Sequence, residues 1–155
     1  LPMSHVHQTA ITSLTIKGAA EALEFYKKAF GAVERYRLEG PGGVLMHAEI
    51  QIGESVLMMS DEFPDWGSLS PSTIGGCPVT IVLYVPDADA AQAQAIKAGA
   101  KERMPVSDQF WGDRMGSVSD PYGYKWSLGT RKEILSPEQI RERFKEFAQK
   151  GEAGC

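Results

Sequence analysis

The sequence has few of the features that mark secreted, membrane or cysteine-based proteins. Its 155 residues include two cysteines, Cys77 and Cys155, too few for a disulfide framework or a Cys-rich zinc site. No apolar run approaches the roughly 18 residues that span a bilayer, and no charged-then-apolar leader opens the chain. We therefore expect a cytoplasmic protein that does not associate with a membrane.

An excess of positive charge is also missing. Lys and Arg number 16 against 20 Asp and Glu, and the net charge of −4 disfavours binding to a nucleic-acid backbone. The sequence contains no Walker loop and no GxSxG elbow, so phosphate-loop and serine-hydrolase chemistry find no support. Cys77 has no evident histidine partner and is interpreted as an incidental thiol.

The two halves of the chain repeat each other. Residues 31–35, GAVER, recur as residues 99–103, GAKER. Each copy follows an alanine-rich stretch, at 19–30 and at 88–98, and alanine is the best helix former. A run rich in β-branched residues precedes each stretch, and the glycine that follows suits a helix C-cap. The sequence therefore predicts the same strand–helix unit twice.

Further strands are predicted after each helix. With the run that precedes each helix, the predicted strands cover residues 11–16, 34–38, 45–52 and 55–60 in the first half and 79–85, 102–106, 112–119 and 124–128 in the second. We therefore predict an α+β fold in which paired βαβββ modules form an open, cupped, eight-stranded mixed sheet, followed by a C-terminal helix. The predicted parts of this one domain are a first module at 9–62, a linker at 63–77, a second module at 78–130 and the helix at 131–150.

Three segments resemble a known superfamily. Residues 16–31, IKGAAEALEFYKKAFG, are similar to the first strand–helix unit of the vicinal-oxygen-chelate superfamily of glyoxalases, bleomycin-resistance proteins and extradiol dioxygenases. Residues 120–126, DPYGYKW, match its DPxGxxW turn, and residues 108–114, DQFWGDR, resemble its PhnB-like branch. The resemblance covers about residues 9–130 and implies a homodimer with a ligand cleft on the concave side of the sheet.

The resemblance also implies a divalent metal site, for which this sequence lacks the ligands. The superfamily's enzymes take four metal ligands, normally His or Glu, from the first and last strands of each module. The corresponding positions here are Ile11, Met58, Thr80 and Ser127. Transition metals in proteins prefer imidazole, carboxylate or thiolate, and none of these four side chains supplies one. We therefore predict no bound metal, no other cofactor and none of the chemistry that a metal polarises.

The cleft is predicted to bind a small organic ligand instead. Strand alternation places hydroxyl and apolar side chains on the side of those four positions, which is typical of a small-molecule pocket. The aromatic rings could stack on a planar ligand or serve the core or a subunit interface. Arg114 could hold an anionic or carbonyl group, or pair with a neighbouring acid. The predicted ligand-binding residues are Met58, Thr80, Tyr84, Phe110, Trp111, Arg114 and Ser127.

A second hypothesis concerns the polar face of residues 45–52. There His47 could act as a general base oriented by Glu49, the two side chains could hold a metal away from the superfamily's positions, or both could simply be solvated. The alternative function is an enzyme of lyase, isomerase or dioxygenase type whose relocated site uses His47, Glu49 and Arg114. The leading hypothesis is a dimeric protein that binds or sequesters an organic ligand without a metal.

Overall fold

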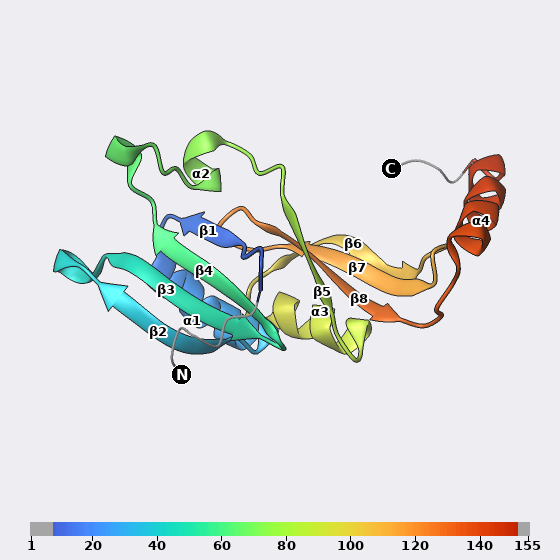
Figure 1. Cartoon of the computed structure of the whole chain (residues 1–155), viewed down its shortest axis with the longest axis horizontal. Helices are drawn as coiled ribbons and strands as arrows, with labels where there is room; N and C mark the ends of the chain where they lie inside the picture. The colour runs from blue at the N-terminus through green and yellow to red at the C-terminus, as the bar shows by residue number, and fades with distance from the viewer. Residues whose placement is uncertain (1–7, 152–155) are drawn as a thin grey trace.

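The computed structural model describes residues 8–151, and Cys155 falls outside this range. The first module contains β1 (Ser13–Ile16), α1 (Ala19–Phe30), β2 (Val33–Glu39), β3 (Leu45–Ile52) and β4 (Ser55–Asp61) (Figure 1). The second contains β5 (Thr80–Tyr84), α3 (Ala88–Ala98), β6 (Lys101–Asp108), β7 (Asp113–Ser119) and β8 (Lys125–Arg131). Short helices η2 (Pro41–Gly43), η3 (Pro64–Trp66) and α2 (Pro71–Ile74) lie in the connections, and α4 (Pro137–Gln149) follows β8. The predicted βαβββ repeat is confirmed.

Each module builds its own mixed sheet. The strand orders are β1-β4-β3-β2 and β5-β8-β7-β6, with β1 parallel to β4, β5 parallel to β8 and the remaining pairs antiparallel. The parallel strand pair of each sheet has a corresponding register. Ser13 of β1 is paired with Met58 of β4, and Val82 of β5 is paired with Ser127 of β8. The α+β class is confirmed, with the eight strands divided into two four-stranded sheets.

The C-terminus of α1 is set by a local signal, and its N-terminus is set by a contact with the sheet. Gly31 closes α1 with a φ of 67°, a left-handed conformation that glycine adopts without strain. The N-terminus of α1 is capped from the end of β4, where Asp61 Oδ1 accepts from the backbone N–H groups of Gly18 and Ala19 at 3.1 and 2.9 Å. The helix therefore starts at a position fixed by the sheet that it covers.

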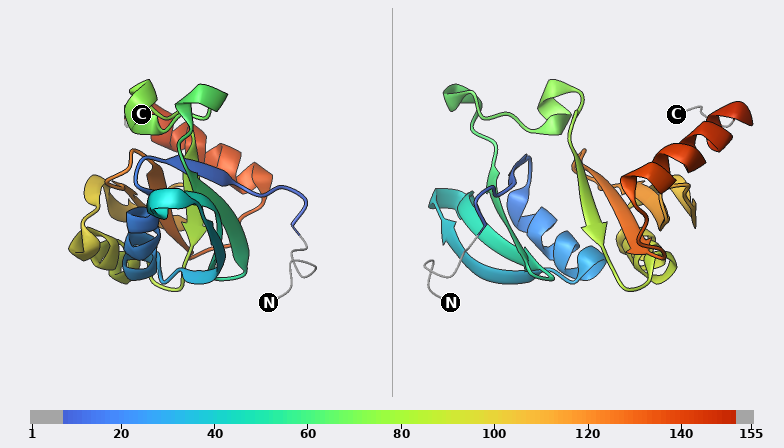
Figure 2. Two further views of the ribbon diagram at one scale, coloured as in Figure 1. Left: turned by 90° about the vertical axis from the view of Figure 1, so that its left-hand side faces the viewer. Right: turned by 45° about the vertical axis from the view of Figure 1, so that its right-hand side comes forward.

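The two helices α1 and α3 pack against each other, and each covers one face of its own sheet (Figure 2). The apolar face of α1 meets the second module through Trp126, whose ring centroid lies 4.4 Å from that of Phe30 and 5.3 Å from that of Tyr26. Trp126 is fully buried beneath α1. We call the face of each sheet that points away from its helix the open face.

A buried carboxylate joins the modules at the same place. Asp120 Oδ2 accepts from Tyr26 Oη of α1 at 2.7 Å and from Trp126 Nε1 at 2.8 Å. Its Oδ1 accepts from the backbone N–H groups of Tyr122 and Tyr124 at 2.8 and 3.0 Å. Burial, followed by the charge of Asp120, raises the pKa of Tyr26 well above its ordinary value, so this phenol remains a hydrogen-bond donor.

No helix within residues 8–151 has both the length and the apolar character needed to cross a membrane. The C-terminal α4 begins with a capping box at Ser136 and Gln139. It lies at the end of the molecule formed by the second module, beyond β7 and β8 (Figure 1).

Candidate functional site

A buried acid with two aromatic partners lies on the open face of the second sheet. Asp113 begins β7. Gly116 of the same strand packs on α3, and successive residues of a strand point to opposite faces, so Asp113, three positions earlier, points to the open face. Asp113 Oδ2 accepts from Tyr84 Oη and from Trp111 Nε1, both at 2.9 Å. Tyr84 comes from the end of β5 and Trp111 from the β6–β7 loop, so three segments converge on one carboxylate.

A guanidinium completes this cluster. Arg131 ends β8 directly opposite Asp113, and its Cζ lies 4.4 Å from the centroid of the Tyr84 ring. The hydrogen bond to Asp113 and burial raise the pKa of Tyr84, while Arg131 acts in the opposite direction. Because the net shift is upward, Tyr84 remains a neutral donor to Asp113 at physiological pH.

The cluster forms the floor of a cavity of about 210 Å³. The lining residues are Tyr84, Trp111, Asp113, Arg131, Glu133, Ile134, Leu135 and Ile140. Two of the predicted ligand-binding residues, Tyr84 and Trp111, therefore share a pocket. Sequence reasoning missed Asp113 and Arg131, although strand alternation from Met115 and from Ser127 would have placed both on this face.

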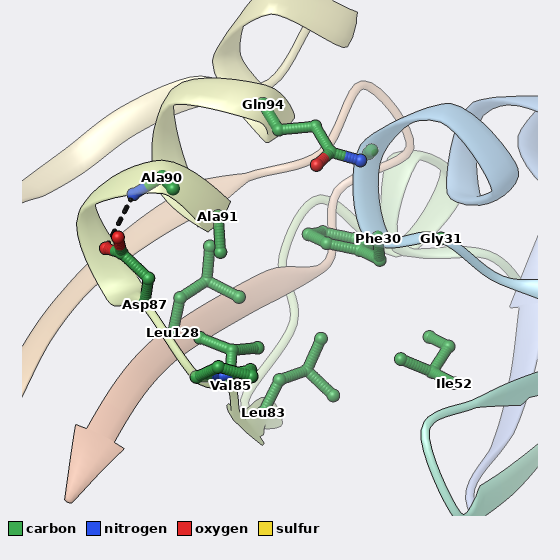
Figure 3. Close-up of a pocket in the computed structure, with 12 residues that line it drawn as sticks. Phe30, Gly31, Ile52, Leu83, Val85, Asp87, Ala90, Ala91, Gln94 and Leu128 are labelled. Carbon is green, nitrogen blue, oxygen red and sulfur yellow. Dashed lines mark hydrogen bonds between the residues drawn. The ribbon is translucent and has the colours of Figure 1, made fainter.

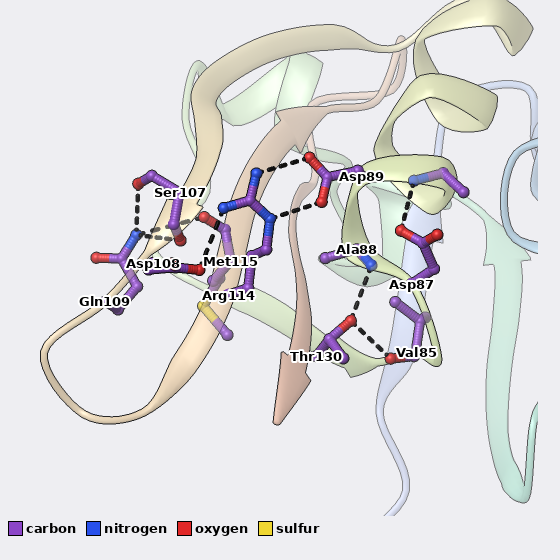
Figure 4. Close-up of polar contacts among 11 residues, drawn as sticks. Val85, Asp87, Ala88, Asp89, Ser107, Asp108, Gln109, Arg114, Met115 and Thr130 are labelled. Atoms are coloured by element: carbon purple, nitrogen blue, oxygen red, sulfur yellow. Dashed lines mark hydrogen bonds and ion pairs between the residues drawn. The ribbon is translucent and has the colours of Figure 1, made fainter. Parts of the chain in front are cut away.

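Phe110 and Arg114 lie elsewhere. The Phe110 ring packs against Phe144 and Phe147 of α4, with centroids 5.5 and 5.2 Å apart. Arg114 points to the helix side of β7, where it pairs with Asp89 of α3 at 2.6 Å and with Asp108 at 3.1 Å (Figure 4). Hydrogen bonds to these two acids, first Asp89 and then Asp108, hold the Arg114 pKa above its usual range. Of the two alternatives for Arg114, the structure shows pairing with neighbouring acids. Arg114 does not enter the Asp113 cavity, because Arg114 and Asp113 lie on opposite faces of the strand.

The polar face of β3 belongs to the first module. The His47 ring centroid lies 5.6 Å from that of Tyr36. Glu49 is 1% exposed, and its Oε2 lies 3.4 Å from Arg35 Nε. Since Arg114 contacts α3 of the other module, the structure does not bring His47, Glu49 and Arg114 together.

Known proteins share this fold and much of this sequence. The model of the Glyoxalase/Bleomycin resistance protein/Dioxygenase superfamily matches residues 5–128. The chain belongs to this superfamily. The resemblance inferred from its motifs is thereby confirmed.

Several known proteins are similar to this chain. An uncharacterised protein of Mycobacterium bovis is 43% identical over 131 residues, which is 83% of this chain and 86% of the relative. The structure of an Arabidopsis thaliana gene product is 28% identical, with a TM-score of 0.64 over 79% of this chain and 98% of that one. A Bacillus cereus structure described as a putative 3-demethylubiquinone-9 3-methyltransferase, PhnB protein, is 17% identical, with a TM-score of 0.58 over 79% of this chain and 99% of that one, and shows the fold alone.

The four positions that the resemblance assigns to the superfamily's metal carry no side chain suited to a transition metal. Met58 lies in β4, Thr80 begins β5, Ser127 lies in β8, and Ile11 precedes β1. Within the described residues, no three His, Cys, Asp or Glu side chains gather as a metal site would require. The donor chemistry at these positions therefore does not fit the superfamily's metal.

Two other cavities are apolar or mixed in character. One of about 330 Å³ lies between α1, α3 and β5, with Phe30, Ile52, Leu83 and Leu128 among its lining residues (Figure 3). Another, of about 260 Å³, lies between β5 and the first module and includes Thr80 and Val56. Neither gathers charged and aromatic side chains as the Asp113 cavity does.

Proposed function

We propose that this protein binds a small organic ligand in the cavity over Asp113, without the superfamily's metal ion. The observation that carries this proposal is the convergence of Tyr84 and Trp111 on one buried carboxylate, with Arg131 over the Tyr84 ring, beside an open cavity. Small-molecule sites are typically concave, with fixed polar groups that orient the ligand beside apolar side chains, and this cavity places Asp113 and Arg131 beside Leu135 and Ile140. None of the residues at the four metal positions is a typical metal ligand, which supports ligand binding through protein side chains without a metal ion.

Binding is favoured over catalysis by the state of the polar groups. Asp113 Oδ2 already accepts two hydrogen bonds, and the raised pKa of Tyr84 keeps that phenol protonated. A phenol that stays protonated can donate a hydrogen bond to a ligand but cannot act as a general base. The rival enzyme made of His47, Glu49 and Arg114 gains no support, because both Glu49 and Arg114 are engaged in separate ion pairs.

Metal analysis tests the metal-independent part of the proposal. Protein purified from medium supplemented with zinc, iron, manganese and nickel is expected to contain far less than one metal atom per chain. Its thermal midpoint is expected to stay unchanged on dialysis against a chelator, because no donor cluster would lose a ligand. One tightly held metal per chain, whose removal abolishes ligand binding, would contradict the proposal.

The proposal includes a homodimer, as the superfamily resemblance implies. Large apolar side chains are exposed on the single chain, and a partner subunit would bury such groups. They include Val33, Leu38, Val82, Ile134 and Phe144. Light scattering on the eluting protein is expected to give twice the 16.9 kDa of the chain. A mass of one chain across a wide concentration range would show that the dimer is wrong and leave the ligand proposal standing.

A further inference from the structure

One wall of the Asp113 cavity comes from residues beyond the range that the superfamily model matches. The superfamily match ends at residue 128, whereas the cavity is also lined by Arg131, Glu133, Ile134, Leu135 and Ile140. The Arabidopsis thaliana structure is covered over 98% of its own length but covers only 79% of this chain. Segment 131–140, which comprises the last residue of β8 and the residues after it, therefore forms a wall that lies beyond the matched range.

This wall is attached directly to the loop that carries Trp111. The backbone N–H groups of Lys132 and Glu133 both donate to the carbonyl of Gly112 at 3.0 Å. Gly112 has a φ of +98°, and a Cβ atom there would lie 2.8 Å from the Glu133 carbonyl oxygen. Only glycine allows so close an approach, so the cavity wall and Trp111 are held in a fixed relation.

The body of α4 is held against this wall by an ion pair and by aromatic contacts. Arg143 donates to both carboxylate oxygens of Glu133, at 2.6 and 3.0 Å. The Phe110 ring lies against Phe144 and Phe147. The apolar residues Leu135 and Ile140 are thus positioned over the polar floor of the cavity.

The charged side chains that line this cavity differ in the partners that they have. Of its two acids, Asp113 has the donors of Tyr84 and Trp111, and Glu133 has the guanidinium of Arg143. Arg131 lies over the Tyr84 ring, and no acid among residues 8–151 lies within ion-pairing distance of it. A guanidinium carries five N–H donors in a planar fork that matches a carboxylate. Asp113 is held by neutral donors, and Arg131 is the one cation among the lining residues, so its guanidinium is placed to pair with an anionic ligand.

We infer that segment 131–140 makes this cavity selective for a small apolar carboxylic acid, whose carboxylate pairs with Arg131. Its apolar body lies between Trp111, Leu135 and Ile140. A cavity of 210 Å³ corresponds to roughly seven water molecules, which suits one ring bearing a carboxylate. This inference rests on the proposed function, since it names the ligand class for the same cavity.

The test uses three probes of one shape and different charge: benzoate, benzyl alcohol and benzylamine. The chain has three tryptophans, so its ¹⁵N spectrum contains three indole N–H signals. Trp111 reports on the cavity, Trp126 reports on the core, and Trp66, which is 73% exposed, reports on non-specific effects. Benzoate is expected to shift the Trp111 signal alone and saturably, with a Kd of about 1 mM or tighter, and the other two probes are expected to bind at least about tenfold more weakly.

Two arginine variants separate the role of Arg131 from general electrostatics. Arg131→Gln is expected to weaken benzoate binding about tenfold or more, because the charged partner is lost. Arg141→Gln, at an exposed position of α4, changes the net charge equally and is expected to leave binding unchanged. An unshifted Trp126 signal in each variant shows that the fold is intact.

The outcomes separate the two levels of the proposal. If benzyl alcohol or benzylamine shifts Trp111 as strongly as benzoate, or if Arg131→Gln binds benzoate normally, the carboxylate inference is wrong while the cavity remains a ligand site. If none of the three probes shifts Trp111, both the inference and the proposed binding cavity are contradicted.

Discussion

Asp120→Asn is expected to destabilise the protein by about 3 kcal/mol or more, nearly as much as Asp120→Ala. The asparagine amide would keep an oxygen for the backbone N–H groups but place an NH₂ where Oδ2 now accepts from Tyr26 and Trp126. The phenol can turn its hydrogen away, whereas the indole N–H is fixed in the ring plane. A buried donor would then face another donor, and a domain of this size has a total stability of only about 5–15 kcal/mol.

Urea unfolding of the purified variants, followed by circular dichroism, measures this loss. Asp108→Asn is the matched control, because it makes the same chemical change at an acid whose side chain is 75% exposed in a surface ion pair. That control is expected to change the free energy of unfolding by about 1 kcal/mol or less. If Asp120→Asn were as mild as Asp108→Asn, the carboxylate would not be what joins α1 to the second module.

Much of this architecture could be predicted from local patterns in the sequence. The boundaries of α1 and α3 agree with the predicted ranges 19–30 and 88–98 residue for residue, because glycine C-caps and alanine content are local signals. Strand alternation opposite the predicted polar face of residues 45–52 leads to Ala48 and Ile50, and both are buried in the core. The repeat then supplied the second module from the first.

The residues that form the candidate site were harder to predict. Side-chain chemistry predicts Tyr84 and Trp111 as ligand-binding residues. The same reasoning favours Arg114 over Asp113, which is the shared partner of the two aromatic residues and lies on the opposite face of the strand. The segment that closes the cavity, residues 132–136, has no periodicity that a sequence pattern could use. Its position follows from hydrogen bonds to Gly112, which are long-range contacts invisible in a single sequence.

A register shift explains a second omission. The pairing of β2 with β3 slips between Glu34 and Tyr36, so regular alternation fails at Arg35. That slip allows Arg35 to reach both Glu49 and Gln51, with Nη1 donating to Gln51 Oε1 at 3.1 Å. The sequence pattern therefore indicates Glu49 as a catalytic candidate but does not reveal its ion pair with Arg35.

The Arg35–Glu49 pair also gives a sharp test of the enzymatic alternative. Glu49→Leu is expected to cost about 3–5 kcal/mol in unfolding free energy, because it leaves a guanidinium uncompensated in the interior. The Arg35 side chain is only 6% exposed, and its Nη2 atom is buried without a hydrogen-bond partner. The double variant Arg35→Met with Glu49→Leu removes both charges and this unsatisfied group, so it is expected to lie within about 1 kcal/mol of the parent or above it.

This double-mutant cycle separates a structural pair from a functional one. His47→Ala, on the same strand but with its ring at Tyr36, serves as the control and is expected to cost no more than about 1 kcal/mol. If the pair is structural, the double variant should also keep benzoate binding at the Trp111 signal, because both residues lie in the other module. A Glu49→Leu variant as stable as the parent would contradict this view, since a buried acid that contributes nothing to folding is the kind of residue that a reactive site retains.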